Sequence, residues 1–307
     1  MYKLIRYIRH NKTKVLITVG MIVGVLIVIQ VLNRIAGYQL EQNSKIENES
    51  NTANTSKIYQ PNKTIISNTS VSEKEAEDNT KTIDKFVEFC NKGDTKSAYD
   101  MLTDECKENM FKNIDFFIDN YYKTIFTEKK NYNIQSWITY GDNYTYKIRY
   151  TEDLLATGKS NDNVIEDFIT IVEGEKLNIN NFIMREKIEK KRESQNIAIN
   201  IKYKNIYKNY EEYMFEVTNN TEKLVLLDSL KESSTVKLIG ENDVEYQALT
   251  NELSKYDVSI PPQNTKNVKI RFTKEYNPRR KIKEIIFTDI ILDTENKEDK
   301  TNMEIEI

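Results

Sequence analysis

Few residues of this 307-residue chain could carry out nucleophilic or acid–base chemistry. Its only histidine, His10, lies in a basic stretch near the amino terminus. The rest of the chain therefore cannot form a Ser-His-Asp triad, a Cys-His pair or a histidine-ligated metal site. The two cysteines, Cys90 and Cys106, could form a disulfide or remain as buried free thiols, and both alternatives are ordinary. Since two cysteines alone cannot make a structural zinc site, we expect no bound metal and no cofactor.

Carboxylates are the remaining candidates for chemistry. Glu166 and Asp167 are neighbours on a predicted strand, so one side chain should point to each face of the sheet. If the inward carboxylate lay beside Tyr146 or Tyr150 in an apolar pocket, burial would raise its pKa and suit it to proton transfer. The alternative, which we favour, places both carboxylates on the solvent side or near a strand end. We expect no catalytic residue and retain Tyr146, Tyr150, Glu166 and Asp167 as a hypothetical ligand pocket.

Three helices should precede the strands that hold these residues. Apolar residues from Ile83 to Cys90 follow the spacing of an amphipathic helix, and Gly93 supplies its stop signal. A short helix should follow. A longer third helix should open at Thr103, where side-chain caps and acidic residues suit the positive end of the helix dipole, and its apolar stripe reaches Ile125.

After Asn131 the apolar residues alternate with a period of two, which is typical of half-buried strands. Four strands are predicted in succession, and the last of them contains Leu177, Ile179 and Ile183. Helices followed by an antiparallel meander predict an α+β domain over residues 80–185, with the helices on one face of the sheet.

The stretch Phe86–Thr103, FVEFCNKGDTKSAYDMLT, resembles the opening of NTF2-like (cystatin-like) domains: a short helix, Gly-Asp, then Ala-Tyr-x-x-Leu. The resemblance implies a curved sheet that wraps a long helix and leaves a pocket at its open end. Domains of this kind occur in membrane-anchored, extracytoplasmic proteins of low-GC Gram-positive bacteria, including proteins of conjugative elements. The resemblance covers about a third of the chain and concerns fold rather than activity.

The second half of the chain is predicted to be all β. The dense charge run at 186–194 should be a linker between two domains, and residues 195–307 contain several short apolar runs separated by turns. We expect the strand at Val268–Phe272 to pair with the strand at Ile285–Phe287. The pattern resembles bacterial Ig-like modules, which implies a β-sandwich.

The amino-terminal region has the features of a membrane anchor. The first forty residues contain no Asp or Glu, and Val15–Leu32 is an 18-residue apolar run with few interruptions. At 1.5 Å per residue this run is about 27 Å long, close to the hydrocarbon thickness of a bilayer. Five Lys or Arg residues precede it and only Arg34 follows closely, so the amino terminus should stay in the cytoplasm.

These features predict a basic cytoplasmic tail at 1–14, a transmembrane helix at 15–36 and a disordered linker at 37–79. A cleaved signal peptide is the alternative, but its apolar region would be shorter and would end at a small-x-small site, which the residues after Leu32 lack. We expect a single-pass protein of the cell membrane that contacts the lipid bilayer through 15–36 and exposes both globular domains outside the cytoplasm.

The functional prediction is a non-enzymatic scaffold that binds protein partners in the cell envelope. The net charge of −3 and the pI near 5.6 argue against a nucleic-acid binder. An NTF2-like domain behind one membrane helix resembles the VirB8-type subunits of conjugation machines, which implies a role in conjugative transfer. Two alternatives remain: a module that binds a small ligand in an open NTF2-like pocket, and an enzyme that uses an inward carboxylate. A filled interior would count against the ligand-binding module.

Overall fold

The computed structural model describes residues 73–307, except for positions 142, 153–163, 174 and 231–233. All the described residues belong to a single compact unit. The predicted cytoplasmic tail and membrane helix, and residues 37–72 of the predicted linker, lie outside the described residues. The linker prediction is wrong for residues 73–79, which are helical. None of the helices among the described residues is long and apolar enough to cross a membrane.

One long helix and several short ones form the first part of the fold. They are α3 (Glu73–Lys92), α4 (Thr95–Asp100), α5 (Asp104–Met110), α6 (Ile114–Phe117), the π-helical turn η1 (Ile118–Tyr122) and α7 (Lys123–Ile125). Gly93 adopts a φ of +74° and ends α3 as predicted, since left-handed backbone at this position is favourable for glycine. Asp94 then caps α4 by accepting a hydrogen bond from the backbone N–H of Ser97 at 3.1 Å.

The long third helix was predicted wrongly, because it is interrupted between Met110 and Ile114. Phe111 leaves the helical conformation (φ −140°, ψ 82°) and buries its ring. Asn113 then starts a new helix by accepting a hydrogen bond from the N–H of Phe116 at 2.8 Å. The apolar spacing across this point is the same with or without the interruption, so periodicity alone did not reveal it.

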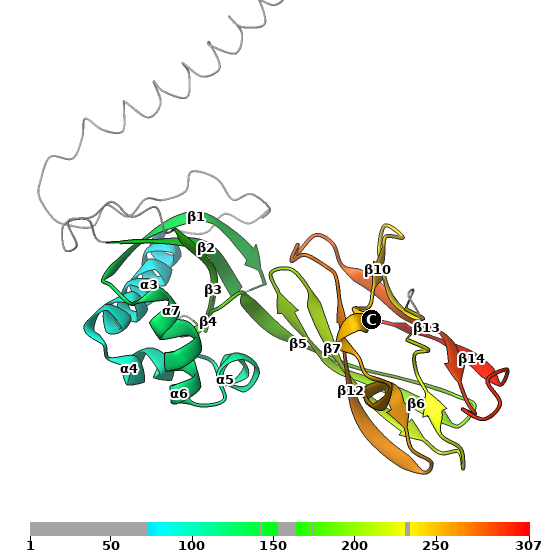
Figure 1. Ribbon diagram of the computed structural model, residues 1–307. Helices are drawn as coiled ribbons and strands as arrows, with labels where there is room; N and C mark the ends of the chain where they lie inside the picture. Colours follow the sequence, from blue (N-terminus) through cyan, green and yellow to red (C-terminus); the bar gives the residue numbers. More distant parts are fainter. Residues whose placement is uncertain (1–72, 142, 153–163, 174, 231–233) are drawn as a thin grey trace, which may run out of the picture. The chain divides into compact units, whose positions relative to one another are not determined.

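The predicted meander is present as one antiparallel sheet. Strands β1 (Lys130–Tyr140), β2 (Asn143–Glu152), β3 (Ile165–Val172) and β4 (Lys176–Asn178) pair in that order. The fourth strand is shorter than predicted: it ends before Ile179, and Ile183 lies in the strand that follows. The helices and this sheet share one hydrophobic core, and Figure 1 shows the helices beside the strands. The predicted α+β class is therefore confirmed for this part of the chain.

The charged residues 186–194, predicted as a linker, lie instead within strand β5 (Phe182–Ser194), which is continuous for 13 residues (Figure 1). Phe182 belongs to the core of the helical part, and the strand pairs with β6 (Ile197–Tyr207) from Phe182 to Ser194. The prediction failed because β5 lies at the edge of its sheet. Exposed Lys and Glu side chains are common at an edge, where they discourage pairing with other chains.

Two further sheets complete the fold. The first has the strand order β12 (Asn264–Phe272), β7 (Glu211–Asn219), β6 and β5. The second has the strand order β10 (Glu245–Gln247), β9 (Val236–Gly240), β13 (Ile282–Ile291), β8 (Val225–Leu226) and β11 (Ser259–Ile260). Strand β14 (Lys300–Glu306) also pairs with β13. The short helices η2 (Thr250–Glu252) and α9 (Lys255–Val258) connect β10 to β11. Both sheets contribute to one buried core, an arrangement compatible with a β-sandwich.

The predicted pairing of the Val268–Phe272 strand with the Ile285–Phe287 strand is wrong. Strand β12 pairs with β7, and β13 pairs with β9, β8 and β14 in the other sheet. Both strands present apolar side chains to the same core from opposite sheets, so their alternation alone could not distinguish neighbours within a sheet from partners across the core.

The helical part and the β part meet in direct contacts. A small apolar cluster contains Ile138 from β1, Ile183 and Met184 from β5, Ile206 from β6, and Tyr276. Beside it, the buried amide of Asn205 donates to Asn109 of α5 at 3.1 Å and accepts from the guanidinium of Arg185 at 2.9 Å. These contacts and the shared strand β5 join the two parts without an intervening linker.

Candidate functional site

Asp167 is the inward member of the predicted carboxylate pair, so the placement that we favoured, with both carboxylates on the solvent side, is wrong for Asp167 and holds only for Glu166. Its side chain is 3% exposed and accepts hydrogen bonds from the hydroxyl of Tyr121 at 2.8 Å and from the backbone N–H groups of Asn180 and Asn181 at 3.1 and 2.9 Å. Both asparagines have positive φ and lie at the centre of the turn between β4 and β5, as a type I′ turn requires. The carboxylate of Asp167 therefore fastens this turn to the sheet.

The electrostatics of Asp167 fit this structural role. Burial raises the pKa of its carboxyl group above the ordinary value, although the hydrogen bonds from Tyr121, Asn180 and Asn181 act in the opposite direction. Burial likewise raises the pKa of Tyr121 and Tyr150 well above the usual range, and the nearby Asp167 adds to that effect. Both carboxylate oxygens are engaged with protein donors, which leaves no direct contact for a substrate.

Aromatic side chains fill the interior around Asp167. Tyr150 and Tyr121 are fully buried, with their hydroxyl oxygens 3.3 Å apart. Phe117 stacks on Tyr121 with 5.7 Å between ring centroids, and Phe111 meets both rings edge-on at 5.4 and 5.8 Å. Phe126 packs against Tyr150 at 5.4 Å. The side chains of the chain itself thus pack the space around Asp167 in which the hypothetical ligand pocket would have to lie.

The other two residues of the hypothetical pocket lie elsewhere. Glu166 is on the opposite face of the sheet, where Lys147 and Arg149 approach it at 2.8 and 3.1 Å and lower the pKa of its carboxyl group. Tyr146 is buried, and its hydroxyl accepts a hydrogen bond from the amide of Asn79 in α3 at 3.1 Å. Of the four residues, the structure brings Asp167 and Tyr150 together, through Tyr121.

Cys90 and Cys106 are buried free thiols, so the disulfide alternative does not describe them. Burial raises the pKa of the Cys106 thiol to about 12 and that of Cys90 above its usual range. A thiol that stays protonated is a poor nucleophile and a poor metal ligand. Among the described residues, no three or more His, Cys, Asp or Glu side chains are grouped so that they could hold a metal ion.

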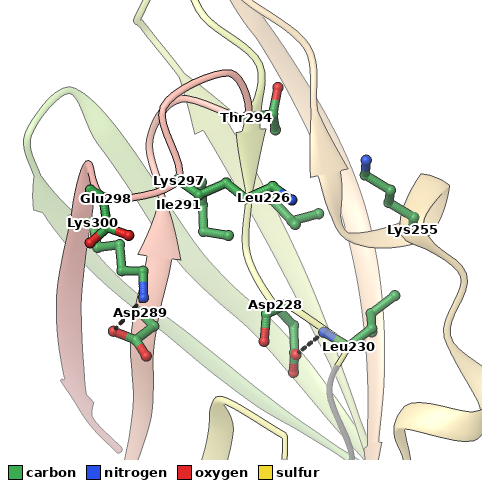
Figure 2. A pocket seen from close by; sticks show the side chains of 11 residues that line it. Leu226, Asp228, Leu230, Lys255, Asp289, Ile291, Thr294, Lys297, Glu298 and Lys300 are labelled. Atoms are coloured by element: carbon green, nitrogen blue, oxygen red, sulfur yellow. Dashed lines mark hydrogen bonds and ion pairs between the residues drawn. The ribbon is translucent and has the colours of Figure 1, made fainter.

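An open site lies instead in the β part. We call it the Lys255 cleft, a hollow of about 500 Å³ whose lining includes Leu226, Asp228, Lys255, Asp289, Ile291 and Lys297 (Figure 2). These residues come from β8 and the segment after it, from α9, from β13 and from the β13–β14 loop. The hollow has the size of a typical ligand or peptide site.

The cleft forms where the sheet is irregular. Along one side of β13 the partner strand changes, from β9 at the pair Phe287–Val236 to β8 at the pair Ile291–Leu226. Between these pairs Asp289 adopts a positive φ of 58°, and the register of β13 with β14 shifts. Such a bulge bends the strand and re-aims its side chains, and bulges are frequent next to functional sites.

The charges in the cleft are unequally compensated. Asp228 is completely buried and accepts hydrogen bonds from the N–H of Leu230 at 2.7 Å and from the hydroxyl of Ser234 at 2.6 Å. Asp289 lies 3.6 Å from the amine of Lys300. By contrast, neither Lys255 nor Lys297 forms an ion pair with any residue that the structure describes. Both lysines are exposed.

Helix α9 also contributes to a second hollow of about 460 Å³, the β12 groove, whose lining includes Leu253, Asp257, Asn267 and Lys269. Tyr256, between Lys255 and Asp257, is 79% exposed, more than any other large apolar side chain among the described residues. Tyr256 lines neither hollow, but the residues on either side of it do: Lys255 lines the cleft and Asp257 lines the groove. Aromatic residues are enriched at protein-binding surfaces.

Nothing in the sequence pointed to the Lys255 cleft. Its charged residues look like ordinary surface Lys, Asp and Glu, and they are scattered from position 228 to position 300. Only the change of partner strand along β13 brings them together. The exposed Tyr256 follows Ser254 and Lys255 in a polar stretch, which gives no amphipathic pattern to detect.

Comparison with known proteins does not assign the chain to a family. No protein family model, no curated protein and no solved structure matches it.

Proposed function

We propose that this protein is a non-enzymatic scaffold that binds other proteins at the outer face of a cell membrane, held there by residues 15–36. The proposal rests on a difference in packing between the helical part and the β part. The interior of the helical part is packed with aromatic rings, whereas two hollows on the β part are lined by the residues before and after the exposed Tyr256. Open hollows beside an exposed aromatic residue support binding to a macromolecule.

The same observation counts against the two alternatives. A small ligand in the helical part would have to displace Phe111, Phe117 or Tyr121 from a well-packed core. An enzyme using Asp167 would have to release the carboxylate from the turn that it fastens. Each event costs several hydrogen bonds or contacts before any substrate is bound, so the scaffold is the better proposal.

A narrower version of the proposal places the scaffold in a conjugative-transfer apparatus. Its support is the resemblance of Phe86–Thr103 to NTF2-like domains and the single predicted membrane helix, which together resemble VirB8-type subunits. The direct connection of the helical and β parts through β5 suits a subunit that holds partners at a defined spacing.

The proposal is tested by photo-crosslinking in intact cells. The photoreactive residue p-benzoylphenylalanine replaces Tyr256 in the full-length protein, and Phe116 and Val244, which are 44% and 49% exposed, serve as matched positions. We expect discrete crosslinked products at Tyr256, identified by mass spectrometry as envelope proteins. Transfer-channel subunits among them would support the narrower version. If no position gave a crosslink to another protein, the scaffold proposal would be wrong.

A further inference from the structure

Tyr256 is held in place before any partner arrives. The side chain of Ser254 and that of Asp257 form a reciprocal capping box that closes the single turn of α9. Val258 at the end of the turn is fully buried, and the amine of Lys266 lies 4.0 Å from the centroid of the Tyr256 ring and bonds to the backbone oxygen of Tyr256. Because the turn is anchored on both sides, docking against this ring would cost little conformational entropy.

The unpaired charge beside Tyr256 is positive. Lys255 and Lys297 are the cations of the cleft that have no ion-pair partner among the described residues, whereas Asp228 and Asp289 are engaged. Glu298, the remaining carboxylate of the lining, has no ion pair there either, but Figure 2 shows it next to Lys300, on the other side of the view from Lys255. The lining of the cleft thus offers two exposed amines, Lys255 on α9 and Lys297 on the β13–β14 loop.

The floor of the cleft is apolar. Leu226 and Ile291 are paired across β8 and β13 and are each 7% exposed, and Figure 2 shows their side chains next to that of Lys297. Apolar side chains bordered by amines can bind a chain that carries both an aliphatic residue and carboxylates.

We propose that the Lys255 cleft binds an acidic peptide segment of a partner protein. Carboxylates of that segment contact Lys255 and Lys297, an aliphatic side chain packs on Leu226 and Ile291, and the adjoining residues contact the Tyr256 ring. This inference rests on the proposed scaffold function and adds the chemistry of the segment that the scaffold recognises.

The first test measures binding of two synthetic probes to the full-length protein in detergent. The acidic probe is fluorescein-labelled Asp-Leu-Glu-Asp-Leu-Glu, and the neutral probe is its isosteric counterpart Asn-Leu-Gln-Asn-Leu-Gln. We expect fluorescence anisotropy to show at least about tenfold tighter binding of the acidic probe at low salt, and a smaller difference as ionic strength rises and screens the exposed charges. Equal affinity for the two probes would overturn the proposal.

Charge reversal then locates the site. The double variant Lys255→Glu/Lys297→Glu should weaken binding of the acidic probe about tenfold or more, because two attractions become repulsions. The matched control is Lys190→Glu/Lys281→Glu, which reverses two exposed lysines that form no ion pair with the described residues, one on β5 and one before the opposite end of β13. An equal loss in the control would show that net charge, not the cleft, governs binding, and would contradict the proposal.

Tyr256→Ala should weaken the same probe about fivefold, because the peptide loses an aromatic contact next to the charged site. All these side chains are exposed, so the thermal midpoint of unfolding should be unchanged and would confirm that the variants fold.

The crosslinking experiment separates failure of this inference from failure of the scaffold proposal. If crosslinks at Tyr256 persist at full yield in the Lys255→Glu/Lys297→Glu background, the protein is a scaffold that recognises its partner by other chemistry, and the acidic-segment inference is wrong. Loss of those crosslinks in that background alone, with retention in the Lys190→Glu/Lys281→Glu background, is the result we expect.

Discussion

The helical part and the β part of this protein each contain a buried aspartate with a similar structural role, but they differ in how tightly the surrounding volume is packed. Asp167 in the first and Asp228 in the second both accept hydrogen bonds from nearby turns or loops and are inaccessible to solvent. In the helical part the surrounding volume is packed with rings, whereas in the β part it opens into the Lys255 cleft. A buried acid next to tyrosines is thus a structural feature here, and the accessible chemistry lies among exposed lysines.

The largest effect should come from removing the acid of the helical part. Asp167→Ala removes the acceptor that the Tyr121 hydroxyl and two partly buried backbone N–H groups share, so we expect a loss of about 3 kcal/mol in the free energy of unfolding. Urea denaturation of the full-length protein measures it. Glu166→Ala, the matched change on the exposed face, should cost less than about 1 kcal/mol. Equal losses would contradict the structural role of Asp167.

A smaller loss is expected at the contact between the two parts. Asn205→Ala removes the partner of Asn109 and of Arg185 at a fully buried position, and should cost about 1–3 kcal/mol. Asn267→Ala, at an exposed position of β12, serves as the control and should change the unfolding free energy by less than about 0.5 kcal/mol. If Asn205→Ala changed the unfolding free energy as little as Asn267→Ala, the polar contact of Asn205 would contribute nothing to the stability of the junction between the two parts.

The pH dependence of stability should distinguish Asp167 from an ordinary surface acid. Because burial holds the pKa of Asp167 above its unfolded value of about 3.9, its contribution is fully present below that value and is lost as the pH rises through the folded pKa. The stability of the unmodified protein relative to Asp167→Asn should therefore increase as the pH is lowered through the acid range. Unfolding titrations of both proteins at a series of pH values would show it, and a decrease on acidification would contradict the assigned direction.

Among these variants, the replacement of Tyr256 should change stability least while it weakens binding. Tyr256→Ala should leave the unfolding free energy within about 0.5 kcal/mol, since the ring is 79% exposed, while it weakens capture of the partner. The unfolding free energy and the binding affinity should be measured on the same preparation of each variant. Replacement of Asp167 should mainly reduce stability, whereas replacement of Tyr256 should mainly reduce binding. A stability loss at Tyr256 as large as that at Asp167 would remove the contrast.

Much of the local structure could be predicted from periodicity. The helical spacing from Ile83 to Cys90 and the alternation from Tyr144 to Tyr150 correspond to α3 and β2. What periodicity cannot show is which strands become neighbours, since this depends on contacts between distant residues, as the pairing of β12 with β7 illustrates. The charge run at 186–194 was misread because an edge strand has few apolar residues to alternate.

The candidate site was the less predictable feature. Residues that suggested chemistry, Glu166 and Asp167, lie on opposite faces of β3, one in ion pairs and one beneath a turn. The residues that line an open cleft are common surface types brought together by a bulge and a change of partner strand near Asp289, and neither feature has a signature in this sequence.

Strand β5 has a consequence for how this protein could have been assembled in evolution. Thirteen residues at about 3.3 Å each make a strand of about 43 Å, and recombination within 186–194 would cut it and leave the row of backbone donors and acceptors of β6 without a partner. Such an exposed edge favours aggregation, so hybrid proteins joined at this position would be selected against. We expect the helical and β parts to be inherited together, and to be exchanged as one genetic module.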